Sequence, residues 1–166
     1  MNLGELVLKG TRTKVDVTTG LQAFGLVVTA EPYFAVTQPS DRVVLENYVR
    51  PDTLGKIEEI NSRYELIEKN TYAFERMPRN LLPPLLDEAL PLDLREAENA
   101  VRIAKWAGAE DYAWETMSHA EDLLDQAEGY YVRRAGAKPI ATVAREAVQT
   151  AEDARLIAMR ASGGGR

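Results

Sequence analysis

Hydrophobic and polar positions alternate along residues 1 to about 70, a pattern that is typical of half-buried β-strands. Turn-forming pairs such as Thr19-Gly20 and Arg50-Pro51 separate the alternating runs. Because successive side chains of a strand point to opposite faces, each run predicts one strand of an antiparallel sheet or small sandwich. The expected strands cover residues 5–9, 14–18, 25–30, 33–36, 42–49 and 56–67.

From Asp93 onwards the hydrophobic positions recur every three or four residues, which predicts helices. Asp93 and Glu96 have the spacing of a capping box that begins the first helix, and Gly108 can end it in a left-handed turn. The second helix is expected at about residues 113–135. Pro139 suits the first turn of the third helix, where its missing N–H costs no hydrogen bond. The apolar stripes of the three helices are Ala97, Ala100, Val101 and Ala104, then Met117, Ala120, Leu123, Leu124, Ala127 and Tyr131, then Ile140, Val143, Ala144, Ala147, Val148, Ala151, Ala154 and Ala158.

Residues 71–92 are predicted to form a connector, because their prolines forbid a continuous helix. The leucines of the connector are too numerous for a free linker, so we expect Leu82, Leu85 and Leu86 to lie against one half of the chain or against a partner. The sequence therefore predicts an α+β chain. It has a β-rich domain (1–70), the connector, an alanine-rich antiparallel three-helix bundle (93–162) and a flexible tail (163–166).

Alanine dominates the helical stripes, and this limits the stability that we expect of the bundle. Small side chains let helix axes approach near the lower end of the usual range of about 8–10 Å. Each alanine, however, buries little area, at roughly 25 cal/mol per Å². We therefore expect support from the β half, from a continuing coiled coil or from self-association.

Composition excludes several classes of function. The 166 residues are 45% hydrophobic and 28% charged, which is typical of a globular protein, and the net charge of −6 argues against nucleic-acid binding. The chain contains no cysteine, which excludes disulfides, thiolate metal ligands and cysteine nucleophiles. No apolar run approaches the roughly 20 residues that a membrane-spanning helix needs. The start of the chain does not look like a secretory signal, so we expect the signal of an exported protein to lie upstream or to have been removed.

One histidine could carry chemistry. His119 lies on the second predicted helix, with Glu115 four residues before it and Asp122 three residues after it. A metal site or an acid–base pair is one interpretation, and a solvated helix face is the other. One histidine with two carboxylates lacks the ligand set of a known metal motif, and no phosphate-binding or nucleophile-elbow glycine pattern occurs. We therefore expect no enzyme activity, no cofactor and no metal.

Two groups of aromatic residues are candidates for binding. Tyr130 and Tyr131 precede Arg133 and Arg134 at the end of the second helix, where arginine complements the helix dipole. Tyrosine and arginine are enriched at binding hot spots, so these four residues are candidate interface residues. The β half carries a second group, which forms either cross-strand core pairs or a platform for a glycan or peptide. This group consists of Tyr33, Phe34, Tyr48, Tyr64, Tyr72 and Phe74.

The helical half resembles a known family, the uncharacterised alanine-rich helical domain that often precedes an OmpA-like peptidoglycan-binding domain in envelope proteins. The resemblance covers about 70 residues. It is carried by Ala97-Glu98-Asn99-Ala100, Ala107-Gly108-Ala109, Tyr112-Ala113-Trp114-Glu115, the run from Ala120 to Glu128 and the run from Ala144 to Arg155. Trp114 departs from the proline that the family commonly has there. The run from Val28 to Asp41 also resembles segments upstream of this domain in acidobacterial OmpA-type proteins.

The resemblance implies a periplasmic or outer-membrane-associated protein without catalytic activity. The alanine seam and the leucine-rich connector lead us to expect association with like helices or with another envelope protein. A link to the cell wall would pass through a C-terminal OmpA-like domain that this chain lacks. We therefore expect a non-catalytic structural or interaction module, and the alternative is a glycan- or peptide-binding module that uses the aromatics of the β half.

Overall fold

The computed structural model describes residues 2–7, 12–16, 18, 20, 26–37, 39, 42–46, 65–66 and 90–163. The chain divides into two compact units. The β unit comprises Met1–Glu31 and Thr37–Ala73, and the helical unit comprises Pro32–Val36 and Phe74–Arg166. The five residues Pro32–Val36 therefore belong to the helices, although they lie between two strands in the sequence.

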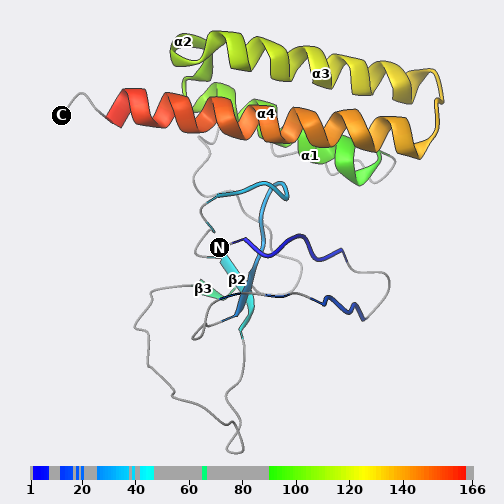
Figure 1. The fold of residues 1–166 in the computed structure, drawn as a ribbon, viewed down its shortest axis with the longest axis vertical. Helices are drawn as coiled ribbons and strands as arrows, with labels where there is room; N and C mark the ends of the chain where they lie inside the picture. Colours follow the sequence, from blue (N-terminus) through cyan, green and yellow to red (C-terminus); the bar gives the residue numbers. More distant parts are fainter. Residues whose placement is uncertain are drawn as a thin grey trace, which may run out of the picture. The chain divides into compact units, whose positions relative to one another are not determined.

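Among the described residues of the β unit, three strands form one sheet in the order β1-β2-β3. Figure 1 labels β2 and β3. Strand β1 (Val27–Thr29) pairs antiparallel with β2 (Arg42–Glu46), and the register shifts between Val28 and Thr29. Strand β3 (Glu65–Leu66) pairs parallel with β2. The antiparallel prediction is confirmed for the first pair and wrong for the second. A parallel pair needs a long connection, and the 18 residues between β2 and β3 supply one.

The alternating pattern overestimated the strands. The three expected strands at residues 25–30, 42–49 and 56–67 each contain one of the observed strands β1, β2 and β3. Residues 47–49, 56–64 and 67 lie outside the described residues. Residues 5–7 and 14–16 form no strand, and the expected strand at 33–36 is wrong because these residues form a turn. The aromatic side chains of that turn pack against helices, so their alternation with small residues does not reflect a pleated sheet.

Residues 90–163 of the helical unit form four helices where three were expected. They are α1 (Leu92–Trp106), α2 (Ala109–Tyr112), α3 (Trp114–Val132) and α4 (Ala137–Gly163). The additional helix α2 is a single turn between α1 and α3. Gly108, which follows α1, has φ +85°, the left-handed conformation that was predicted for it. Gly136, in the connection between α3 and α4, has φ +96°. This conformation is costly for a residue with a Cβ atom.

The predicted capping box is wrong. Helix α1 has Pro91 at its N-cap and no side-chain cap, so Asp93 lies inside the first turn. The Asp93 carboxylate instead accepts a hydrogen bond from Arg145 of α4 at 3.2 Å. The Asp93 carboxylate therefore binds Arg145 of another helix instead of a backbone N–H group of α1. It still lies at the positive end of the α1 dipole, which favours an acidic side chain.

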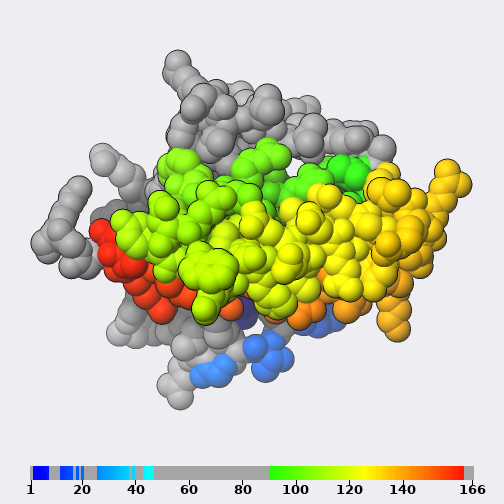
Figure 2. Space-filling model, turned by 90° about the horizontal axis from the view of Figure 1, so that it is seen from above, coloured from blue at the N-terminus to red at the C-terminus, as the bar shows by residue number. Residues whose placement is uncertain are grey.

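The core of the helical unit lies where α4 contacts both α1 and α3. Figure 1 shows α3 and α4 side by side and antiparallel, and Figure 2 shows the long face that α3 presents. The predicted stripes are confirmed, except that Tyr131 is exposed and that Leu124 and Val143 are only partly buried. The completely buried alanines are Ala97, Ala104, Ala109, Ala120, Ala127, Ala144, Ala147, Ala151, Ala154 and Ala158.

These alanines are covered within the chain itself, so the stripes do not form an exposed seam that needs a partner. None of the helices that the structure describes is long and apolar enough to cross a bilayer.

Candidate functional site

The segment Pro32–Val36, hereafter the strap, lies against the helices of its unit. Its central residue, Tyr33, is only 3% exposed. The side-chain amide of Asn99 on α1 donates to the carbonyl oxygen of Pro32 at 3.3 Å. One buried aromatic ring and one backbone contact therefore fix the strap to the helical unit.

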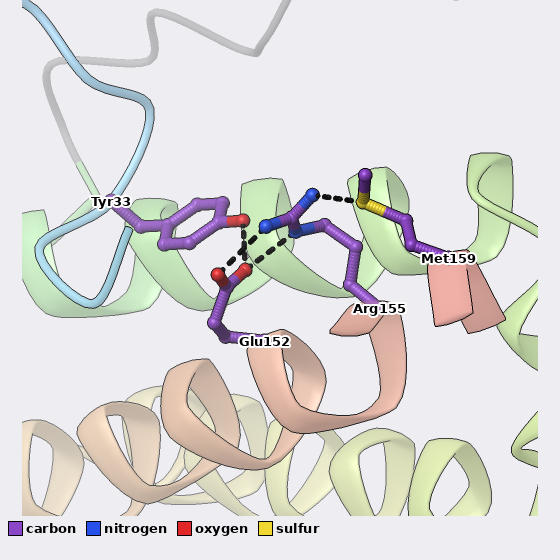
Figure 3. Close-up of polar contacts among 4 residues, drawn as sticks. All are labelled: Tyr33, Glu152, Arg155 and Met159. Carbon is purple, nitrogen blue, oxygen red and sulfur yellow. Dashed lines mark hydrogen bonds and ion pairs between the residues drawn. The ribbon is translucent and has the colours of Figure 1, made fainter. Parts of the chain in front are cut away.

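A buried polar cluster holds the Tyr33 hydroxyl (Figure 3). The hydroxyl donates to Oε2 of Glu152 at 2.7 Å. Arg155 donates to the same carboxylate through Nε, at 2.6 Å to Oε2, and through Nη2, at 2.8 Å to Oε1. The Nη1 of Arg155 lies 2.7 Å from the sulfur of Met159. The strap is therefore joined to α4 by a two-point arginine–carboxylate pair and a tyrosine, which together form the Tyr33–Glu152–Arg155 cluster.

The electrostatics of this cluster suit a structural role. Burial raises the pKa of the Tyr33 hydroxyl, and the hydrogen bond to Glu152 raises it further, so the phenol stays protonated and remains a donor. The hydrogen bond to Glu152 also raises the pKa of Arg155. Glu152 is 3% exposed, and both of its oxygens accept hydrogen bonds from the chain itself. The carboxylate therefore has its acceptors occupied and is enclosed, which suits anchoring rather than proton transfer to a substrate.

A second contact fixes the other aromatic residue of the strap. The guanidinium of Arg145 lies 3.8 Å from the centre of the Phe34 ring, within the range of a cation–π interaction. The same guanidinium forms the ion pair with Asp93 at 3.2 Å. Arg145 thus connects the strap, α1 and α4, and it stabilises the position of Phe34 against the helices.

Sequence reasoning missed this cluster because it placed Tyr33 and Phe34 in a sheet. A signal was present in α4, however. Val148, Glu152 and Arg155 have the i, i+4 and i+7 spacing of one helix face, so two charged residues interrupt an otherwise apolar stripe. Buried charges need a partner, and this stripe therefore indicated a polar contact in the core.

The candidate metal or acid–base site on α3 is not assembled. His119, Glu115 and Asp122 are all exposed. Across the part of the chain that the structure describes, no three His, Asp or Glu side chains gather in a way that could hold a metal ion.

The structure brings the predicted interface residues of α3 together at the connection to α4. Tyr130 packs partly against the core, its hydroxyl lies 3.4 Å from the side-chain nitrogen of Gln126, and the Arg133 guanidinium lies 5.4 Å from the centre of its ring. Tyr131, Arg133 and Arg134 are exposed. Arg134 has φ +55°, an uncommon conformation for a residue other than glycine. The other candidates, Leu82, Leu85, Leu86, Tyr48, Tyr64, Tyr72 and Phe74, lie outside the described residues.

The opposite end of α3 carries a group of exposed aromatics that sequence reasoning did not select. Trp106 is 50% exposed, Tyr112 is 54% exposed and Trp114 is 65% exposed. Large exposed aromatics at several neighbouring positions are typical of contact surfaces. Their clustering could have been noticed in the sequence, since all three fall within nine residues.

Acidic residues accompany these aromatics. Glu110 forms an ion pair with Lys105 at 3.5 Å, and Lys105 also pairs with Glu121. The hydrogen bond to Glu121 raises the pKa of Lys105, which keeps this lysine charged. Asp111 and Glu115 are exposed on the same part of the chain.

Comparison with known proteins gives no matching family model, no matching curated protein and no matching solved structure.

Proposed function

We propose that this chain is a non-catalytic structural and interaction module of a bacterial cell-envelope protein, which acts by helix packing and by association with itself or with an envelope partner. In this proposal α1, α3 and α4 form an alanine-rich three-helix bundle, and the β-rich part docks or anchors. The resemblance of the helical half to envelope domains supports the setting. The contacts of the helical unit support the mode of action.

The observation that carries the proposal is the contrast between the inside of the helical unit and its ends. Inside, the alanine stripes are buried by the chain itself, and the polar groups of the Tyr33–Glu152–Arg155 cluster form hydrogen bonds with one another. At the ends, Trp106, Trp114 and Val132 are at least half exposed. Exposed aromatic and apolar side chains gain free energy when a partner covers them, so the ends are the surfaces suited to association.

Light scattering coupled to size-exclusion chromatography tests the association. The average mass should rise with protein concentration between about 1 µM and 1 mM, because contacts formed by small surfaces are weak. A mass equal to one chain at every concentration, together with no capture of envelope proteins by the immobilised chain, would refute the proposal. Fractionation of cells that express the natural protein tests its setting, and recovery outside the envelope fraction would contradict it.

A further inference from the structure

The connection between α3 and α4 is a basic end. From Gly129 to Ala144 the sequence contains three cationic residues and no acidic residue. These three residues, Arg133, Arg134 and Lys138, are all exposed, and together with the exposed Glu128 just before them they leave two positive charges. The first turn of α4 likewise carries no acidic side chain. Val132, which is 78% exposed, adds an apolar side chain to the surface of this basic end.

The other end of the helical unit, formed by α2 and the start of α3, is acidic and is called the acidic end. From Trp106 to Ser118 the sequence contains Glu110, Asp111 and Glu115 and no cationic residue. Lys105 and Arg160 lie at the same end, so three negative and two positive charges leave one negative charge. Trp106 and Trp114, in the same part of the chain, are at least half exposed. The acidic end therefore offers carboxylates and indole rings together, and both attract cations.

A single helical unit cannot bring these two ends together. Helix α3 separates them, and its 19 residues give a rod about 28 Å long at 1.5 Å per residue. This length exceeds the screening distance of about 8 Å at physiological salt. Figure 1 shows α2 and the α3–α4 connection at opposite ends of the paired helices. Complementary ends on one rigid rod can only meet between molecules.

We propose that the basic end of one copy binds the acidic end of a second copy, so that helical units join head to tail. This inference rests on the self-association in the proposed function. Arg133, Arg134 and Lys138 of one copy would contact the carboxylates and indole rings of the next. Two like ends repel each other, so the contact joins different surfaces of the two copies. Such a contact leaves one end of each type free and can continue into open strings.

Charge reversal at either end tests the proposal in the full-length chain. The basic-end variant is R133E/R134E, and the acidic-end variant is D111K/E115K. A matched control, D122K/D125K, reverses two exposed carboxylates in the middle of α3. Circular dichroism first verifies that every variant keeps the helical content of the natural chain. Sedimentation velocity then measures the dissociation constant at about 50 mM and 500 mM NaCl, since surface charge pairs weaken as salt screens them.

Each end variant alone should raise the dissociation constant at least about tenfold, because attraction at the contact is replaced by repulsion. An equimolar mixture of the two end variants should associate again. The basic end that R133E/R134E has made acidic can now bind the acidic end that D111K/E115K has made basic in the other variant. The control should stay within about twofold of the natural chain. Association should weaken at the higher salt concentration.

The outcomes separate this inference from the proposed function. If the natural chain associates, but the end variants do not weaken it and the mixture restores nothing, the head-to-tail contact is wrong and the association stands. If D122K/D125K weakens association as much as the end variants, net charge rather than the two ends controls it, and the contact is again wrong. If the natural chain stays monomeric at 1 mM and low salt, the contact and self-association are both refuted, while capture of an envelope partner still supports the proposed function.

Discussion

Replacing Tyr33 by phenylalanine removes one hydroxyl from the buried cluster and keeps the ring that fills the core. The hydroxyl donates to Glu152 at 2.7 Å, and this carboxylate is almost completely buried. Hydrogen bonds to charged groups contribute about 1.5–3 kcal/mol, and the lost donor leaves a buried acceptor with one partner fewer. We therefore expect Tyr33→Phe to lower the free energy of unfolding of the helical unit by about 1.5–3 kcal/mol.

Urea denaturation followed by tryptophan fluorescence measures this change in the right unit. The chain has two tryptophans, Trp106 and Trp114, and both lie in the helical unit. Tyr112→Phe is the matched control, because Tyr112 is 54% exposed on the same unit. Its effect should stay within about 0.5 kcal/mol, as is usual for surface substitutions.

A double-mutant cycle with Glu152→Gln assigns the energy to the contact. If the hydroxyl acts through Glu152, the two substitutions together should cost less than the sum of their separate effects, with a coupling energy of about 0.5–3 kcal/mol. A Tyr33→Phe variant as stable as the Tyr112→Phe control, or a cycle without coupling, would refute the view that this cluster anchors the strap.

Three further predictions concern the pH dependence of the Tyr33 contact, the packing of α4 and two glycines of the helical unit. Because burial raises the pKa of Tyr33 above its ordinary value of about 10, the stability from its neutral hydroxyl is complete below about pH 10 and is lost as the pH rises beyond it. Denaturation between pH 9 and 11 should show this loss in the natural chain and a flatter profile in Tyr33→Phe. Ala147→Leu should lower the free energy of unfolding by about 1–3 kcal/mol, because Ala147 is fully buried and a larger side chain has no room there. Ala161→Leu is the control and should change it little, because Ala161 is exposed. Equal effects of the two substitutions in urea denaturation would contradict the packing of α4. Gly108→Ala should destabilise by about 1 kcal/mol, because φ is +85° and a Cβ atom would lie 3.4 Å from the Tyr112 ring. Gly129→Ala in the last turn of α3, where only the flexible end of Arg133 is near, should raise the free energy of unfolding by about 0.5–1 kcal/mol. Thermal denaturation in which Gly108→Ala is the more stable of the two variants would refute this reasoning.

The helices were the part of the fold that the sequence predicted best. The spacing of Ala97, Ala100 and Ala104 indicated one buried face of α1, and the structure buries all three. Gly108 was expected to end the first helix in a left-handed turn, and its φ is +85°. These predictions succeeded because helical periodicity and the cost of a Cβ atom at positive φ act over a few residues.

The candidate site was only partly predictable. The grouping of Tyr130, Tyr131, Arg133 and Arg134 at the end of α3 followed from their proximity in the sequence. The Tyr33–Glu152–Arg155 cluster did not, because Tyr33 and Glu152 are 119 residues apart. No local pattern specifies which distant carboxylate a tyrosine will meet.

By itself, the sequence determined where the three long helices lie, which of their faces are buried, and that strands precede them. Only the tertiary structure decided that the strap leaves the β unit to pack against helices, that Asp93 pairs with Arg145 rather than capping α1, and that β3 runs parallel to β2. The physical reason is the range of the forces involved. Backbone sterics and side-chain periodicity are fixed by neighbours in the chain, whereas a buried polar group takes whichever partner the packing of distant elements places within about 3 Å.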